Sequence, residues 1–231
     1  MKSLKDYILN EGFKLGKNKV KKEEDFVDLE LPSKTLWCKY NVGATCRSDA
    51  KSWYGDYFMW GDTKSATNKK CNWENYKWCN CDYDKLIKYC PADKTNYWGG
   101  NGKPDNKLVL DEEDDMVNTN MNGDWKMPTK EQCKELLDNT TNKWVEDYND
   151  IQGLNGRLLT SKLNGNTLFI PAAGFRSGSF IYSTGSIIGI WSSTLDVTDP
   201  LPTYYLLSDN DYIGIGSSYR NRGIPVRGVM N

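Results

Sequence analysis

The chain contains no histidine among its 231 residues. Histidine is the commonest general base and proton carrier near neutral pH, and it is a frequent metal ligand. Its absence excludes Ser-His-Asp and Cys-His mechanisms, so an enzyme with this sequence would have to use carboxylates, lysine, tyrosine or cysteine. Glu112, Asp114 and Asp115 could supply an acid and a base, but we favour an exposed acidic helix start at these positions.

Long apolar segments are also missing. No apolar run approaches the roughly 18 residues that a membrane helix needs, so we expect no membrane span. The N-terminus lacks an apolar core followed by small residues, so we expect no secretory signal. The net charge of −1 gives no overall attraction to nucleic acid or membrane surfaces. We therefore expect a soluble protein without a nucleic-acid partner.

The seven cysteines do not have the spacing of a zinc site. Four of them, Cys71, Cys79, Cys81 and Cys90, are separated by seven, one and eight residues, whereas structural zinc sites usually carry C-x2-C pairs. An odd number of cysteines without an export signal also argues against a full disulfide framework. We predict free, partly buried thiols, no bound metal and no cofactor.

Lysine and glutamate are missing from the C-terminal third. No lysine follows Lys162 and no glutamate follows Glu146, and Tyr, Ser, Gly, Ile, Asn and Asp take their place. Long charged side chains lose much rotamer entropy when a contact fixes them. Tyrosine offers a large, stiff contact area, and Ser, Gly and Asn offer adaptable hydrogen bonds, as in antibody-like paratopes. The composition predicts either a contact surface or a β-rich segment whose Ser and Gly lie in turns.

Two parts are expected along the chain. The residue pattern of 1–25 predicts a short amphipathic anchoring helix followed by a lysine-rich linker. Residues 26–231 are expected to form the main domain. The sequence of the main domain predicts strands, then long aromatic-rich loops, one clear helix and further strands. This order favours an α+β fold with mixed, mainly antiparallel sheets and one or two helices.

Local signals place several elements of the main domain. Thr129 and Gln132 match a capping box, so we predict a helix that begins there. Asn164-Gly165 between two apolar runs predicts a β-hairpin. Residues 83–89 are expected to form a helical turn or two. Short strands are expected at 167–172, 191–194, 204–207 and 224–229.

Seven segments match motifs of one protein family. They are VDLELPSKTLWCKYNVGA at 27–44, YGDYFMWGDT at 54–63, NWENYKWCN at 72–80, GDWKMPTKEQCKELLDN at 123–139, NGNTLFIPAAGFRSGS at 164–179, WSST at 191–194 and PVRGV at 225–229. In this order they resemble the Fibrobacter succinogenes major paralogous domain, a family of bacterial and phage proteins. The chain departs from the family pattern at Glu30 and Lys34, where glycines are usual, which would alter the first turn.

The resemblance implies a C-type-lectin-like fold of the variety shared with formylglycine-generating enzymes. Those enzymes rely on a cysteine pair in the C-terminal part of the domain, and no cysteine follows Cys133 here. Calcium-dependent lectins of this fold carry a Glu/Gln-Pro-Asn/Asp tripeptide and a Trp-Asn-Asp run, and this chain has WSST at 191–194 instead. We expect neither activity. A bound calcium ion with a purely structural role remains compatible with the sequence.

The same fold displays variable loops in targets of diversity-generating retroelements. Mutagenesis of asparagine codons at template adenines can yield Tyr, Ser, Gly, Ile, Asp or Arg, but never Lys, Glu, Gln, Met or Trp. Those five are absent from Leu206 to Gly228. We therefore expect segments 178–190 and 208–222 to form adjacent exposed loops. The predicted contact residues are Tyr182, Ile187, Ile190, Tyr205, Tyr212, Ser218, Tyr219 and Arg222. The predicted core residues are Trp191, Leu206, Ile213, Ile215 and Val226.

The expected function is that of a non-enzymatic binding module in a phage virion. The opening MKSLKDYIL resembles the starts of virion proteins in crAss-like phages. We expect a head-fibre or tail-associated protein that binds capsid or tail proteins through its N-terminal segment. Its C-terminal loops would bind a host cell-surface glycan or protein, and it would form a homo-oligomer such as a trimer. The alternatives are an intracellular enzyme of the formylglycine-generating type and a bacterial surface adhesin.

Overall fold

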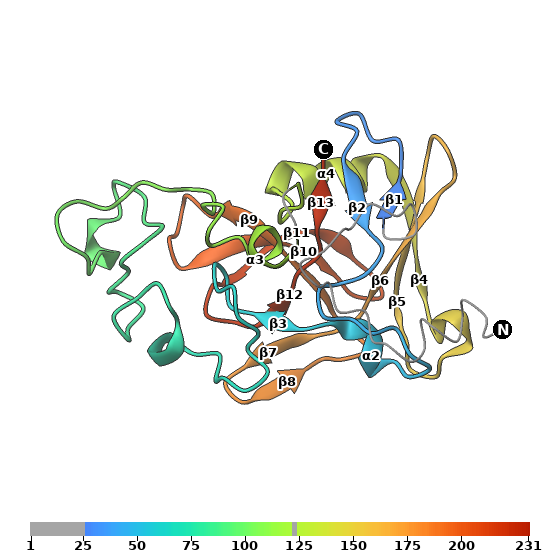
Figure 1. Ribbon diagram of the computed structural model, residues 1–231, viewed down its shortest axis with the longest axis horizontal. Helices are drawn as coiled ribbons and strands as arrows, with labels where there is room; N and C mark the ends of the chain where they lie inside the picture. Colours follow the sequence, from blue (N-terminus) through green and yellow to red (C-terminus); the bar gives the residue numbers. More distant parts are fainter. Residues whose placement is uncertain (1–25, 122–123) are drawn as a thin grey trace.

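The computed structural model describes residues 26–121 and 124–231 (Figure 1). The predicted anchoring helix and linker at residues 1–25 lie outside these ranges, so that prediction stays open. The described residues form an α+β fold with mostly antiparallel sheets and few helices, as the sequence predicts. Within these ranges, no helix has the length and apolar character needed to cross a membrane.

A three-stranded antiparallel sheet lies at the centre of the fold (Figure 1). Its strands, in the spatial order β11-β10-β9, are β9 (Ile188–Leu195), β10 (Pro202–Ser208) and β11 (Ile213–Tyr219). Successive residues of a strand point to opposite faces of its sheet. Ile190 and Leu206 therefore enter one core cluster, whereas Trp191 and Tyr205 belong to a second cluster on the other face.

Burial of both faces confirms most of the predicted core. Trp191, Leu206 and Val226 are fully buried, and Ile213 and Ile215 are half-buried against the first cluster. A sheet covered on both faces has little room for long charged side chains, because burying a charge without a partner is costly. Burial therefore accounts for part of the lysine-free and glutamate-free tail.

A second antiparallel sheet contains the predicted hairpin. Its strands are β4 (Thr140–Val145), β5 (Gly156–Ser161) and β6 (Thr167–Pro171), and a 3₁₀ turn at Tyr148–Asp150 lies between β4 and β5. β5 and β6 pair with each other and enclose Asn164-Gly165. Gly165 has a φ of 73°, a left-handed conformation that glycine adopts without steric cost. The hairpin is confirmed at the position that the Asn-Gly signal predicts.

The predicted capping box also starts a helix. α4 spans Lys130–Asp138. The Gln132 backbone N–H donates to the Thr129 hydroxyl at 3.2 Å, and the Thr129 backbone N–H donates to the Gln132 side chain at 3.0 Å. Cys133 and Leu136 are fully buried on the helix, which contacts all three strands of the central sheet. The helix therefore covers the face of the sheet that carries Ile190.

The two ends of the described chain meet in a third sheet. β2 (Leu36–Cys38) lies between β1 (Phe26–Asp28) and β13 (Val229–Met230), while β12 (Ile224–Pro225) pairs with β3 (Tyr57–Phe58). The strand predicted at 224–229 is therefore broken into two. Between its parts, the fully buried Arg227 donates to Asn41 Oδ1 at 3.0 Å and to the Phe169 carbonyl at 2.8 Å.

The turn between β1 and β2 contains two left-handed residues that are not glycine. Glu30 has a φ of 49° and Lys34 has a φ of 60°. These are the two positions at which the resembled family usually has glycines. A residue with a Cβ loses roughly 1–2 kcal/mol in this conformation, so the backbone here has angles that glycine would adopt more easily.

Lys34→Gly is expected to raise the free energy of unfolding by about 0.5–1 kcal/mol, because glycine relieves the left-handed strain by more than it costs in unfolded-chain entropy. Lys39→Gly is the matched control, since Lys39 is not in the left-handed region; it should lower the free energy of unfolding by a similar amount. Urea unfolding measures both variants. A loss of stability in Lys34→Gly would show that the turn is not strained.

A loop-rich lobe extends to the left of the central sheet in Figure 1. The other short helical elements are α2 (Lys51–Tyr54), α3 (Met116–Asn120) and two further 3₁₀ turns, at Trp73–Asn75 and Thr95–Tyr97. Tyr76 and Leu86 are buried in the lobe's own core cluster, in agreement with the predicted aromatic-rich loops. The helical turn predicted at 83–89 is wrong, because Leu86 forms isolated β-bridges with Cys79 and Trp98 across the lobe.

Arg220 connects this lobe to the central sheet. It follows β11 directly and is fully buried. Its guanidinium donates to the carbonyls of Tyr89 at 2.9 Å, Lys88 at 3.3 Å and Pro200. It also lies 5.6 Å from the centre of the Trp60 ring. A single arginine thus satisfies carbonyl groups from two distant segments.

Candidate functional site

The predicted contact residues do not all reach the surface. Ile190 is fully buried and Ser218 is only 6% exposed, so the prediction that these two are surface contacts is wrong. Ile190 points from β9 into the first core cluster, and Ser218 lies on β11 opposite the buried Thr203. Ile187, Tyr205 and Arg222 are half-buried, which leaves Tyr182, Tyr212 and Tyr219 as the exposed members.

The segment predicted as an exposed loop at 208–222 is mostly strand. β11 pairs with β10 over its whole length and leaves a turn at 209–212. Tyr212 lies in this turn, whose carbonyls accept hydrogen bonds from the guanidinium of Arg157. Tyr212 and Tyr219 therefore lie at opposite ends of β11 and do not form one contact site. The segment at 178–190 consists of part of a hairpin, a short turn and the buried start of β9, and its residues 179–184 are exposed as predicted.

Three predicted contact residues meet in one array. The hairpin of β7 (Phe175–Ser177) and β8 (Phe180–Tyr182) brings the Phe175 and Tyr182 ring centroids within 5.8 Å. The Arg222 guanidinium lies 5.0 Å from the Phe175 ring centre and 6.0 Å from that of Tyr219. Tyr219 in turn meets Trp73, with ring centroids 6.4 Å apart. We call Trp73, Phe175, Tyr182, Tyr219 and Arg222 the aromatic–arginine surface.

Backbone hydrogen bonds bring the three contributing segments together. Arg176 and Gly223 exchange two bonds of 2.6 and 2.9 Å, which places Arg222 beside β7. Gly223 permits this approach, because a Cβ there would meet Cys71 Sγ and Arg176 Cβ at 2.9 Å. Cys71 and Gly178 exchange bonds of 3.0 and 2.9 Å, which join the segment that carries Trp73 to the hairpin. These backbone hydrogen bonds therefore fix the relative positions of the three segments that carry the array.

The side chains of the aromatic–arginine surface suit a binding role. Tyr182 is 46% exposed and Tyr219 is 48% exposed. Arg222 has cation–π contacts to its neighbours and forms no ion pair with another described residue. A guanidinium over aromatic rings keeps its N–H donors available at its edge. Tyr, Trp and Arg are the residues that most often dominate binding energy.

Sequence reasoning missed Trp73, Phe175 and the exposed Phe180 at the tip of the hairpin. Gly178-Ser179 is a two-residue hairpin signal, and Gly178 has a φ of 56°. This signal could have placed Phe175 and Phe180 on a β-hairpin. Trp73 lies about a hundred residues before this hairpin in the chain, and no local sequence pattern predicts its contact with Tyr219.

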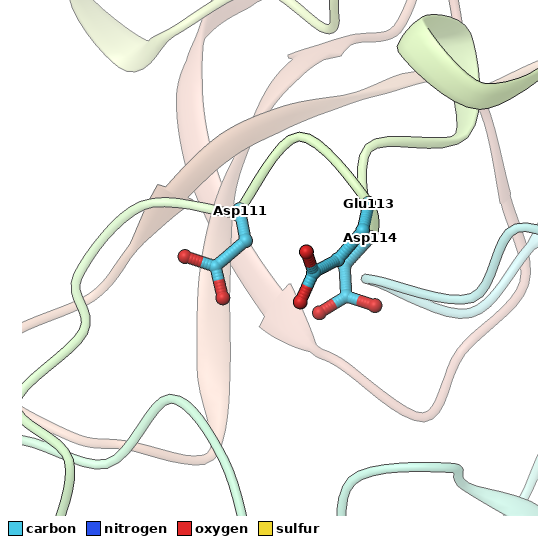
Figure 2. A group of neighbouring side chains, drawn as sticks. All are labelled: Asp111, Glu113 and Asp114. Carbon is cyan, nitrogen blue, oxygen red and sulfur yellow. The ribbon is translucent and has the colours of Figure 1, made fainter.

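A group of acidic side chains lies elsewhere, on the loop before α3. Figure 2 shows Asp111, Glu113 and Asp114 with their carboxylates on the same side of the loop. Lys88 Nζ lies 2.6 Å from a carboxylate oxygen of Asp111, 2.6 Å from one of Asp114 and 3.4 Å from one of Glu113. The ammonium group therefore takes the central position that a cation would occupy.

Two further contacts neutralise this cluster. Lys77 contacts Asp114 at 2.9 Å, and Lys107 contacts Asp111 at 2.5 Å. Burial alone would raise the pKa of the Asp114 carboxyl, but hydrogen bonds from Lys88, Tyr89 and Lys77 outweigh it and hold the pKa below its ordinary value. Hydrogen bonds from Lys107 and Lys88 likewise lower the pKa of Asp111. Both carboxylates are therefore ionised at neutral pH and unsuited to donate a proton.

The exposed acidic helix start predicted here is wrong for two of its three residues. Asp114 and Asp115 are buried. Asp115 is the N-cap of α3 and accepts hydrogen bonds from the backbone N–H groups of Val117 at 2.8 Å and Asn118 at 3.1 Å. It also accepts one from Met127 at 2.8 Å. The two buried carboxylates therefore stabilise the fold, because each accepts hydrogen bonds from its own set of donors.

Removal of divalent ions and disulfide reduction should leave thermal stability unchanged, because lysines already neutralise the carboxylates and the seven cysteines, which all lie in the described ranges, form no disulfide. We expect unfolding midpoints with and without EDTA, and with and without dithiothreitol, to agree within about 2 °C. A midpoint lowered by roughly 10 °C in EDTA would correspond to several kcal/mol and would reveal a structural ion.

Three of the buried cysteines are poorly suited to catalysis. Burial raises the pKa of the Cys71 and Cys90 thiols to about 11 and that of Cys133 to about 12. Such thiols are almost fully protonated at neutral pH, and the thiolate is the nucleophile. In the described part of the chain, only the Asp111 cluster is compact enough to hold a metal, so the cysteines of segment 71–90 do not converge.

Comparison with protein-family models, curated proteins and solved structures gave no match. A functional assignment therefore depends on the chemistry of the described residues. The aromatic–arginine surface is the candidate functional site that this chemistry favours.

Proposed function

We propose that this chain is a non-enzymatic binding module whose contact site is the aromatic–arginine surface. The observation that carries the proposal is the unbroken array from Trp73 through Tyr219, Arg222 and Phe175 to Tyr182. Its central arginine lacks an acidic partner among the described residues, and its outer tyrosines are about half exposed. The array thus offers aromatic area and charged donors to one ligand.

We further propose a C-type-lectin-like fold and a place on a phage particle. The family resemblance supports both, and the left-handed angles at Glu30 and Lys34 agree with the glycines that the family carries at these positions. In this proposal, residues 1–25 bind capsid or tail proteins, and the domain binds a host cell-surface glycan or protein. A bacterial surface adhesin would use the same surface, and detection of the protein in purified virions would distinguish the two.

An enzyme of the formylglycine-generating type is the rival from another class. It would need a reactive cysteine pair, whereas burial raises the pKa of the Cys71, Cys90 and Cys133 thiols far above neutral. The buried cysteines and the accessible aromatic–arginine surface both favour binding over catalysis.

The combined variant Tyr182→Ser, Tyr219→Ser and Arg222→Ser tests the proposal. The fluorescently labelled full chain is incubated with intact cells of several strains of gut Bacteroidetes, the hosts of the crAss-like phages whose virion proteins the N-terminal sequence resembles, and bound protein is measured by flow cytometry. We expect the variant to lose at least about tenfold in binding, since a few such anchors carry most of the energy. Its free energy of unfolding should fall by less than about 2 kcal/mol, because accessible substitutions cost about half a kcal/mol each.

Tyr212→Ser is the matched control. Tyr212 is as exposed as the tyrosines of the array but lies at the other end of β11. Its substitution should leave cell binding unchanged. Unchanged binding in the combined variant, or failure of the native chain to bind any strain, would refute the proposed surface.

A further inference from the structure

The β7–β8 hairpin carries different side chains on its two faces. In an antiparallel pair, directly opposite residues share a face and neighbouring residues alternate. Phe175 pairs with Tyr182 and lies on the face of the aromatic–arginine surface, whereas Arg176 pairs with Ile181 on the other face. Arg176 and Ile181 line a cavity of about 680 Å³.

The cavity combines apolar walls with a few charged groups. Tyr54, Tyr57 and Ile181 line it together with Lys51, Asp56 and Arg176. Its volume is within the roughly 300–1,000 Å³ of small-molecule sites, which also combine apolar walls with a few well-placed polar groups. The cavity is therefore large enough for one or two sugar-sized rings.

The cations of this cavity are unpaired, but its carboxylate is not. Arg176 Nε is buried and has no hydrogen-bond partner. Neither Arg176 nor Lys51 forms an ion pair with any residue of the described ranges. Asp56 already accepts a hydrogen bond from the Thr67 hydroxyl at 3.3 Å. A ligand carboxylate could meet the outer N–H groups of Arg176, which lines the cavity and has no acidic partner among the described residues.

We propose that this cavity binds a sugar acid, with the ligand carboxylate held by Arg176 and Lys51. The planar guanidinium matches a carboxylate in a two-point contact, and the lysine adds a second charge. The Asp56 carboxylate provides further acceptor positions for ring hydroxyls. Tyr54, Tyr57 and Ile181 contact the apolar face of the ring. A neutral sugar of the same shape would leave the Arg176 guanidinium without its anion.

This site is independent of the proposed attachment function. It lies on the opposite face of the hairpin from Phe175 and Tyr182, and its lining includes no residue of the aromatic–arginine surface. A free sugar acid can occupy it whether or not the protein binds cells. The two proposals can therefore succeed or fail separately.

Isothermal titration calorimetry of the full chain with D-glucuronic acid and with D-glucose tests the inference. The two sugars differ in the carboxylate at one position, so we expect glucuronic acid to bind at least about tenfold more tightly. Arg176→Gln should weaken glucuronic acid binding by about tenfold or more, and Lys51→Gln by about threefold. Arg222→Gln is the matched control on the other face and should leave the affinity unchanged.

Equal binding of the two sugars, no measurable binding of glucuronic acid, or weakening by Arg222→Gln instead of Arg176→Gln would overturn the proposal. If Arg176→Gln fails to fold, Lys51→Gln decides the question, because Lys51 is exposed at the rim of the cavity and its removal disturbs little packing. An unchanged affinity in Lys51→Gln would then contradict the site.

Discussion

Asp114→Asn is expected to lower the free energy of unfolding by about 3 kcal/mol, at the lower end of the range for breaking a buried ion pair. The Asp114 side chain is 3% exposed, and its removal leaves Lys88, Lys77 and the Tyr89 hydroxyl facing a neutral amide. In a domain of this size, such a loss shifts the thermal midpoint by roughly 6–12 °C. Thermal unfolding and urea titration measure the effect.

Glu113→Gln is the control in the same cluster. Its side chain is 78% exposed and lies 3.4 Å from Lys88, so we expect a change within about half a kcal/mol. Equal effects of the two substitutions would mean that burial does not govern this cluster.

The pH dependence of this cluster follows from the lowered pKa values of Asp111 and Asp114. A carboxylate whose pKa is lowered in the folded state stabilises the fold at every pH above its unfolded value, near 4. That stabilisation disappears as the pH falls through the folded-state pKa. The difference in stability between the native chain and Asp114→Asn should therefore be constant above about pH 5 and should shrink below about pH 4.

Arg220→Met should cost still more, about 4 kcal/mol, because it leaves the carbonyls of Lys88, Tyr89 and Pro200 without their donor in a fully buried site. Methionine keeps the approximate length of the side chain, so the loss reports on hydrogen bonds and the contact with Trp60. Urea unfolding of the pure variant gives the value directly.

Arg222→Met, two residues later, is the matched control for Arg220→Met. Arg222 contacts Phe175 and Tyr219 through their ring faces and has no buried acceptor to satisfy. We expect this variant to keep its stability within about 1 kcal/mol and to lose cell binding. The reverse result, a stable Arg220→Met and an unfolded Arg222→Met, would contradict the structural role given to Arg220 and the binding role given to Arg222.

Local signals in the sequence predicted local structure well. The capping box at Thr129 and the Asn164-Gly165 hairpin lie where expected, because both depend on hydrogen bonds and backbone angles within a few residues. The helical turn at 83–89 failed because Leu86 bonds across the lobe to residues that no local pattern identifies.

The candidate site was harder to predict because exposure depends on which face of a strand meets a covering element. Ile190 was assigned to the surface from the glycines and serines around it, yet it lies beside Leu206 on the face of the sheet that α4 covers. Burial of both faces of the sheet accounts for part of the tail composition, and the proposed binding role of the aromatic–arginine surface would disfavour the same residues. Composition alone cannot separate these causes, since both disfavour lysine and glutamate.

The most direct test of the binding surface is a saturation mutagenesis scan of residues 163–231, scored separately for folding and for binding to the same bacterial cells. Positions that lose binding while they retain folding should cluster at Phe175, Tyr182, Tyr219 and Arg222, with Tyr212 and Ile187 tolerant. Positions such as Ile190 and Arg220 should lose both properties together. A cluster of binding-specific positions at the 209–212 turn, or none in the tail, would contradict the aromatic–arginine surface as the contact site.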